Sequence, residues 1–299
     1  MVGYGLRMIA GFFKRKTIKT VVPNIVEMIT EQEEDEELAK IMEDHMMKAI
    51  WIFNLYAKWG TLLFSGAAII IGIYFRLNEE YGLMMDLPFE VSNRFLREIQ
   101  FVFQAFFLMI AARSVISLDL AINFLGVHAI AELNTLIDYI RIMDRKVKTQ
   151  RNFLKIILKR HYSVIENIDL INDINSEASF VQLGLSCLAL MFGFSFVLQY
   201  KTGIGNYLII VCGAVLSLPI CILGEVIQFK TDQLANVLYL TNWYDLSVSD
   251  QKAFLIILGM AQREYRLKAA GTYDVNLNAF IQIFKMAISY CAILYSLSQ

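Results

Sequence analysis

Polar and small side chains recur along one face of the last apolar stretch, from Tyr273 to Gln299. The residues of this stripe follow each other at steps of four and three: Asn278, Gln282, Lys285, Ser289, Ala292, Ser296 and Gln299. An α-helix would place all of them on one side. The chain carries no charge after Lys285, as a helix that enters hydrocarbon requires. The stripe either packs small residues between helices or contacts water and ions in a pore.

The remaining reactive residues form no catalytic or metal-binding pattern. The sequence contains no nucleophile elbow, HExxH motif, phosphate loop or paired catalytic carboxylates. Its 4 cysteines stand in apolar runs without CxxC spacing, where cysteine mostly behaves as a small hydrophobic residue. The acidic run at 33–37 is typical of a solvated helix face or loop and lacks the alternating ligands of a calcium loop. We therefore expect no enzyme activity, no cofactor and no metal site.

Composition places the chain among membrane proteins. Of 299 residues, 57% are hydrophobic and only 18% charged, with a mean hydropathy of +0.51, whereas soluble domains carry about 25% charged residues. A net charge of −1 gives no general attraction to nucleic acid. With only 3 prolines, the chain suits long helices, and we expect an all-α, multi-span helical bundle formed by residues 1–299 as one unit.

Five apolar stretches are long enough to span a bilayer. The second begins a long helix that continues past Arg113 and Asp119 to Ile142. Residues 252–268 form the pattern of an amphipathic helix that Gly271 would stop. Residues 1–13 resemble the end of a further span. The expected spans cover residues 51–75, 97–124, 178–200, 205–226 and 275–297.

A basic block between the second and third of these spans orients the chain. Eight Lys and Arg side chains between Arg141 and Arg160 face only one acid, Asp144, which marks a cytoplasmic segment. His161 closes this block, as a surface residue would. Alternation then places 17–50 and 225–272 in the cytoplasm, and 76–98, 201–206 and the C-terminus outside.

Two later segments are similar to those of the insect odorant receptor family. The segment CILGEVIQ at 221–228 is followed by LANVLYLTNWYDL at 234–246, which contains the spaced residues Ala235, Tyr239 and Trp243. Further along, the FLIIL run follows Lys252, and the last helix carries Phe280, Lys285 and the pair Ser289-Tyr290. The match is most specific over 221–299 and looser across the rest. By this resemblance, 227–272 is a cytoplasmic helical anchor region and the last span is a pore helix.

The resemblance implies a subunit of a ligand-gated, nonselective cation channel for small volatile apolar odorants. It further implies a tetramer with the odorant receptor coreceptor, in the plasma membrane of olfactory sensory neurons. The chain lacks the long loop that the coreceptor inserts between its fourth and fifth spans, so we interpret it as a ligand-selective tuning subunit. It departs from the family at its start, where the first span and most of the second are missing.

The resemblance also supplies candidate site residues. Aligned on Ser289-Tyr290, the family pattern places a hydrophobic gate at Ile293, with Ser296 and Leu297 beside it, whereas the polar stripe favours the neighbouring Ala292. The expected pore residues are Gln282, Ser289, Ile293, Ser296 and Leu297. The odorant pocket is expected between helices in the outer half of the membrane, with Ser65, Ile69, Phe103, Phe107, Ile110 and Phe196 as candidates.

Three other interpretations remain at this point. A gustatory-type receptor channel would share the fold, although residues 234–246 favour the odorant branch. A secondary transporter would require repeats or Gly/Pro-broken helices at matching positions of two halves, and the sequence shows none. The short N-terminus also leaves a non-functional truncated receptor as an alternative.

Overall fold

A computed structural model describes residues 14–30, 33, 35–77, 94–150, 152–199 and 204–297. The expected stretch at 1–13, most of the loop at 76–98 and the start of the turn at 201–206 lie outside these residues. The described part is nearly all helical, with one short hairpin. Its elements are α2 (Arg15–Thr30), α3 (Glu36–Leu77), α4 (Arg94–Arg141), α5 (Met143–Thr149), α6 (Phe153–Gln199), α7 (Ile204–Tyr239), η2 (Trp243–Asp245), α8 (Val248–Ala261), β1 (Lys268–Ala269), β2 (Tyr273–Asp274) and α9 (Leu277–Leu297).

Five of these helices, α3, α4, α6, α7 and α9, are long and apolar enough to cross a membrane. The four before α9 contain 42, 48, 47 and 36 residues, far more than the ~20 that a bilayer core needs. The expected spans therefore mark only the apolar parts of longer helices. The single long helix expected from Ile99 to Ile142 is confirmed by α4.

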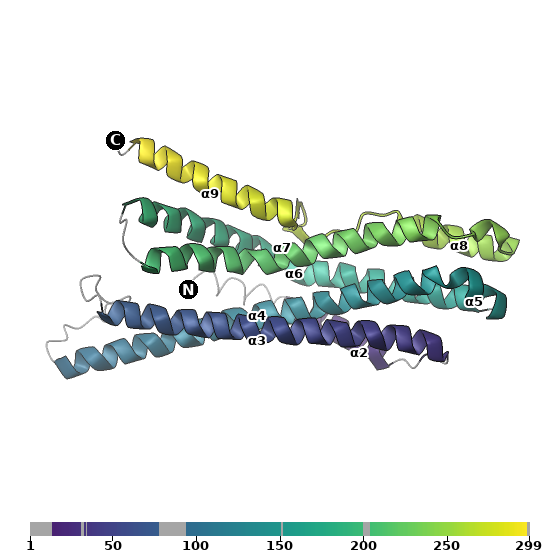
Figure 1. Ribbon diagram of the computed structural model, residues 1–299, viewed down its shortest axis with the longest axis horizontal. Coiled ribbons are helices and arrows are strands. Elements are labelled where there is room, and N and C mark those ends of the chain that lie inside the picture. The colour runs from purple at the N-terminus through teal and green to yellow at the C-terminus, as the bar shows by residue number, and fades with distance from the viewer. Residues whose placement is uncertain are drawn as a thin grey trace.

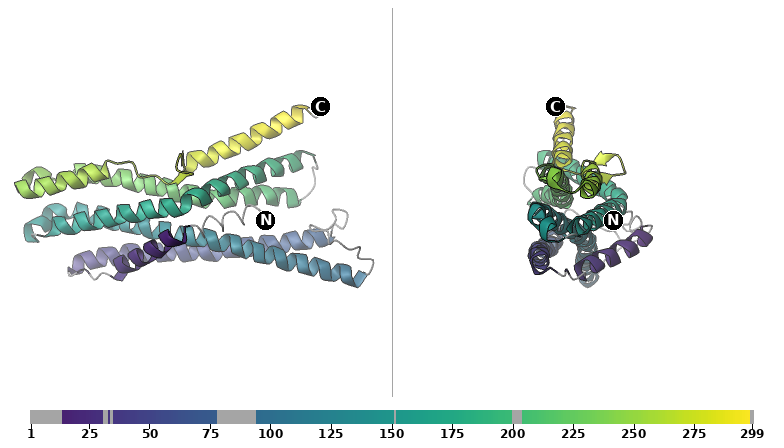
Figure 2. Two further views of the ribbon diagram at one scale, coloured as in Figure 1. Left: turned by 180° about the vertical axis from the view of Figure 1, so that it is seen from behind. Right: turned by 90° about the vertical axis from the view of Figure 1, so that its right-hand side faces the viewer.

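The helices form an elongated bundle with three layers (Figure 1). Antiparallel α3 and α4 form one side, α6 and α7 the middle, and α9 the opposite side, as the end-on view in Figure 2 also shows. Helices α5 and α8 lie together at one end, and the C-terminus lies at the other. The basic block and the anchor region thus share one end of the molecule.

The acidic run expected to be solvated instead pairs with the basic block. Lys146 Nζ lies 2.5 Å from Asp35 Oδ2 and 3.0 Å from Glu37 Oε2, and Arg160 lies 2.6 Å from Glu33 Oε1. Arg145 also contacts Glu37. These charge-assisted contacts hold the start of α3 against α5 and α6. Proximity in the sequence gave no sign of this pairing, because the two runs are more than 100 residues apart.

His161 is buried, so its expected surface position was wrong. Its side chain is 0% exposed, as are those of Ile157 and Val164 on neighbouring turns. The polar block around it suggested a loop, but α6 is already helical from Phe153. A helix that continues through the block turns one face inward every three to four residues, and His161 lies on that face.

The second half of the anchor region also differs from expectation. The helix predicted over 252–268 begins earlier, at Val248, where Ser247 caps it by accepting from the Asp250 N–H, and it ends at Ala261. The chain then forms the β1–β2 hairpin, with Lys268 opposite Asp274. Gly271, expected to stop a helix, lies in the hairpin turn with φ +70°, a conformation that glycine adopts without steric cost.

Candidate functional site: the α9 face and two apolar cavities

One face of α9 packs against α6. The residues of this face recur every four positions: Ala279, Ile283, Ala287 and Cys291, all buried. The Cys291 thiol lies 3.5 Å from the Met191 carbonyl oxygen, and the rings of Phe284 and Phe194 meet edge to face at 6.3 Å. Small residues at this spacing allow close approach between membrane helices. Packing within the chain therefore uses a face different from the polar stripe.

The predicted pore residues lie on the uncovered side of α9. Gln282, Ser289, Ile293, Ser296 and Leu297 are all exposed in the single chain. The Ser296 hydroxyl donates to the Ile293 carbonyl oxygen of its own helix at 2.8 Å, so it needs no partner from another helix. Apolar side chains such as Ile281 and Ile288 are exposed as well. Both the polar stripe and the apolar side chains beside it are therefore exposed, and only its polar residues distinguish the stripe from a surface that faces lipid.

The predicted ligand-binding residues lie on adjacent helices but do not gather around one cavity. Ser65 is half-buried and Ile69 exposed on α3; on α4, Phe107 is half-buried, whereas Phe103 and Ile110 are exposed. Ile110 lines a shallow cavity on α4 together with Arg113 and Ser117. The Phe196 side chain lies outside the described part of the structure.

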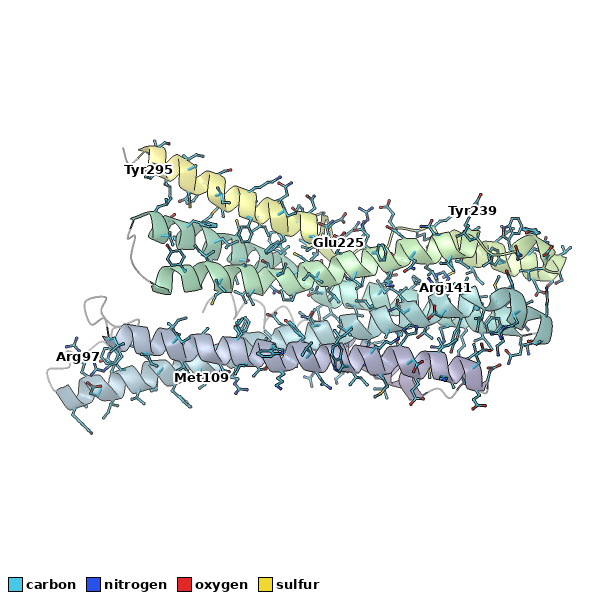
Figure 3. All side chains as sticks on the ribbon, viewed as in Figure 1. Arg97, Met109, Arg141, Glu225, Tyr239 and Tyr295 are labelled. Carbon is cyan, nitrogen blue, oxygen red and sulfur yellow. The ribbon has the colours of Figure 1, made fainter. Side chains whose placement is uncertain are left out.

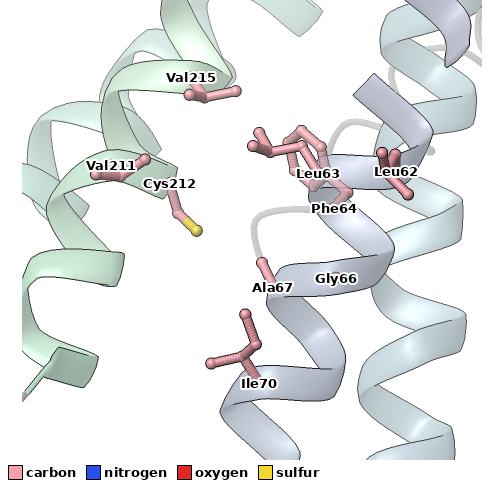
Figure 4. Close-up of a pocket in the computed structure, with 9 residues that line it drawn as sticks. All are labelled: Leu62, Leu63, Phe64, Gly66, Ala67, Ile70, Val211, Cys212 and Val215. Atoms are coloured by element: carbon pink, nitrogen blue, oxygen red, sulfur yellow. The ribbon is translucent and has the colours of Figure 1, made fainter. Parts of the chain in front are cut away.

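An apolar cavity of about 240 Å³ lies between α3 and α7 (Figure 4). The Cys212 side chain points into the space between the two helices, and the lining contains no charged group. Such a lining suits a small apolar ligand. The lining residues are Leu62, Leu63, Phe64, Gly66, Ala67 and Ile70 of α3, and Val211, Cys212 and Val215 of α7.

Two of the residues predicted from the sequence lie beside this cavity on α3 without lining it. Ser65 and Ile69 are the immediate neighbours of Gly66 and Ile70, and adjacent side chains on a helix point about 100° apart. The spacing of Leu62, Gly66 and Ile70 at steps of four was available in the sequence. Nothing in the sequence, however, indicated that α7 would lie opposite them.

A second apolar cavity of about 370 Å³ lies among α2, α3, α4 and α6. Ile18, Phe53 and Ile174 contribute to its lining from three of these helices, and Phe124 from the fourth. Within the described residues no group of three or more His, Cys, Asp or Glu side chains could hold a metal ion. The linings of both cavities are apolar and contain no charged side chain, so they offer a ligand mainly hydrophobic contact.

Comparison with known proteins gives this arrangement a context. The family model described as 7tm odorant receptor matches residues 1–288. The chain belongs to that family. It is similar to odorant receptor 33c of Drosophila melanogaster, with 24% identity over 255 residues that cover 80% of this chain and 65% of the relative. It is also similar to odorant receptor Or1 of Anopheles gambiae, with 26% identity over 46% of this chain and 34% of the relative. The chain thus spans less than two thirds of the length of these relatives.

Solved structures agree on the fold of this odorant receptor family member. The olfactory receptor OR5 of Machilis hrabei in complex with eugenol superimposes with a TM-score of 0.72 at 13% identity, covering 99% of this chain and 79% of that one. The same receptor in a second structure gives 0.68. The all-α, multi-span bundle expected from the sequence is confirmed, as is the family resemblance.

The motif that carried the resemblance is structural in this odorant receptor family member. Trp243 stacks on the buried Phe254 of α8, with ring centroids 6.2 Å apart. The side-chain amide of the neighbouring Asn242 donates to Asp144 Oδ2 at 2.9 Å. The motif therefore fixes α8 and η2 to the end of α7 and to α5.

Proposed function

We propose that the chain is a tuning subunit of a ligand-gated, nonselective cation channel that detects small volatile apolar molecules. It acts with the odorant receptor coreceptor in a tetramer in the plasma membrane of olfactory sensory neurons. Membership of the odorant receptor family supports a receptor function. No group of residues in the described site suggests an enzyme. Channel activity, the coreceptor and the residues of the pore are the additional steps proposed here.

The face of α9 that carries Gln282, Ser289 and Ser296 is the observation that supports a channel most directly. Polar groups are costly in lipid unless they contact protein or water, and α9 packs within the chain through a different face. When copies assemble around an axis, these faces line a common pore. Ile293 is 59% exposed on the same side, and a ring of isoleucines can close such a pore by dewetting.

The ligand site is proposed in the α3–α7 cavity, which replaces the six sequence candidates as our first choice. Its volume of about 240 Å³ suits a molecule of the size of eugenol, the compound present in one of the similar structures. An apolar lining rewards burial at about 25 cal/mol per Å². Selectivity then depends on shape more than on hydrogen bonds.

Two features support a tuning subunit and its orientation. Helices α4 and α6 are joined by the seven-residue α5 and a few flanking residues, which leaves no room for a long insertion. Basic residues of this junction lie at the end opposite the C-terminus. By the positive-inside rule, this supports a C-terminus outside the cell.

The test is recording from cells that express the chain with and without the coreceptor. A panel of small volatile apolar compounds, including eugenol, is applied while sodium and potassium currents are measured. We expect compound-evoked, nonselective cation current only when both proteins are present. Surface expression of both proteins without any evoked current across the panel would contradict the proposal.

A further inference from the structure

The inner end of α9 is held at a joint formed by α6, α7 and the β1–β2 hairpin. The hairpin is tied to α6, because the Lys268 N–H donates to Asn172 Oδ1 at 2.7 Å and the Gly271 N–H to Ser176 Oγ at 2.9 Å. Helix α9 begins only three residues after Asp274, the end of β2. Its base therefore cannot move independently of the hairpin.

Helix α7 contacts the same joint through two consecutive residues. A Cβ on Gly224 would lie 1.9 Å from the Val275 carbonyl oxygen, so the two segments approach this closely only with glycine there. Glu225 then extends to α9, where its Oε2 accepts the backbone N–H of Leu277 at 3.2 Å. Figure 3 shows Glu225 at the point where α7 passes the base of α9.

The hydrogen bond from Leu277 gives a partner to a backbone N–H group at the start of α9. The first N–H groups of an α-helix have no partner within the helix, and a carboxylate there also interacts favourably with the helix dipole. Asn276 caps the helix locally, because its Oδ1 accepts the Ala279 N–H at 2.9 Å. The acceptor for Leu277 comes instead from α7, so moving α9 away from α7 breaks this hydrogen bond.

We propose that Glu225 is a positioning residue that transmits displacement of α7 to the pore helix α9. This inference rests on the proposed channel function. Helix α7 also contributes Val211, Cys212 and Val215 to the α3–α7 cavity, and it stays helical through Pro219 to Tyr239. At 1.5 Å per residue, about 15 Å of helix separates Val215 from Glu225. One helix thus links the cavity to the base of α9.

Three variants separate this tether from other roles of the carboxylate. Glu225→Ala removes the acceptor, whereas Glu225→Gln keeps a carbonyl oxygen that can accept the Leu277 N–H but loses the charge. Glu166→Ala is the matched control, since Glu166 is an exposed glutamate of α6 away from the joint. Each variant is expressed with the coreceptor, and evoked current is normalised to surface protein.

We expect the maximal evoked current to fall about tenfold in Glu225→Ala, as loss of the hydrogen bond from the Leu277 N–H implies. It should stay within about twofold of wild type in Glu225→Gln and Glu166→Ala. Wild-type current in Glu225→Ala would overturn the proposal. Equal loss in the Ala and Gln variants would also overturn it, because charge and not the tether would then matter.

Hydrogen exchange of the purified full chain gives a second readout that does not depend on current. In Glu225→Ala the amide of Leu277 should exchange roughly tenfold faster than in wild type, and in Glu225→Gln it should stay protected. Unchanged protection in Glu225→Ala would show that no tether exists. A protected wild-type amide that depends on Glu225, together with no evoked current, would contradict the channel proposal and not the tether.

Discussion

The ammonium nitrogen of Lys146 lies 2.5 Å from a carboxylate oxygen of Asp35, although the two residues are 111 positions apart. Their side chains are 12% and 19% exposed, so the pair is shielded from water on most sides. It connects the segment before α3 with the junction between α4 and α6. The end of the bundle that carries α5 is thus fixed by charge as well as by its apolar core.

This pair predicts a pH-dependent contribution to stability. The hydrogen bond from Lys146 lowers the pKa of Asp35 below its ordinary value of 3.8. A carboxyl with a lowered pKa stabilises the fold above its ordinary pKa, and that contribution disappears as the pH falls through the folded-state value. Lys146→Met should therefore lower the free energy of unfolding by about 1 kcal/mol at pH 7, and this difference should shrink as the pH falls below 3.8 and through the lowered pKa of Asp35.

Unfolding of the detergent-solubilised chain, followed by circular dichroism in denaturant, measures this difference. Lys155→Met is the control, because Lys155 is an exposed lysine of α6 in the same basic block. Equal effects of the two substitutions at pH 7 would mean that the Asp35–Lys146 pair contributes nothing of its own.

Filling the α3–α7 cavity should weaken the response to ligand without unfolding the chain. A Cβ on Gly66 would have no atom within 4 Å, so Gly66→Phe can place its ring in the cavity without moving the backbone. Because the ring would occupy the ligand volume, we expect the concentration for half-maximal response to rise at least about tenfold. Dose–response recording with the coreceptor provides the measurement.

Gly184→Phe is the matched control for this substitution. Gly184 is exposed on α6, and a Cβ there would likewise meet nothing within 4 Å. It should leave the response unchanged. A normal response of Gly66→Phe across the whole panel of compounds would place the ligand elsewhere.

The six sequence candidates remain testable against this cavity. Shrinking Phe107 to Ala should change which compounds activate the channel while surface expression persists, if the pocket extends to the α4 side of α3. The comparison is a response spectrum for single substitutions at Ser65, Ile69, Phe103, Phe107, Ile110 and Phe196. An unchanged spectrum in all six, with a changed one in Gly66→Phe, would restrict the site to α3 and α7.

The orientation of the chain is checked by epitopes at the two ends of the bundle. A tag inserted near Lys148, in α5, should bind antibody only after permeabilisation, because the surrounding basic residues stay in the cytoplasm. A tag after Gln299 should be labelled on intact cells. Labelling of the Lys148 tag on intact cells would contradict the proposed topology.

Local sequence patterns predicted the parts of this fold that depend on neighbouring residues. Hydropathy located the five spans, and the period of three to four residues identified the stripe on α9, because both signals arise within one helix. The pairing of Asp35 with Lys146 and the burial of His161 could not be found this way. Each depends on which helices meet after folding, and charge alone marks such segments as solvated.

Part of the candidate site could likewise be predicted from the sequence of one helix, and part depends on which helices meet after folding. The α9 face that we propose lines the pore was predicted from its own sequence, together with the family pattern that adds Ile293. The α3–α7 cavity needs the position of Val211 and Cys212 opposite Gly66, a contact between helices more than 100 residues apart in the sequence. The joint at Glu225 is also tertiary, although the segment CILGE was recognisable as part of a motif.

The measurement that tests the central claim most directly is cysteine scanning of α9 from Gln282 to Leu297. The scan is made in a background whose native thiols do not react, with a thiol reagent applied while ligand holds the channel open. We predict block of current at Gln282, Ser289, Ile293 and Ser296, recurring every three or four positions. Ala287→Cys should stay insensitive, because position 287 is buried against the bundle. Uniform insensitivity with expression and ligand response intact, or block confined to the buried face, would contradict the assignment of α9 as the pore helix.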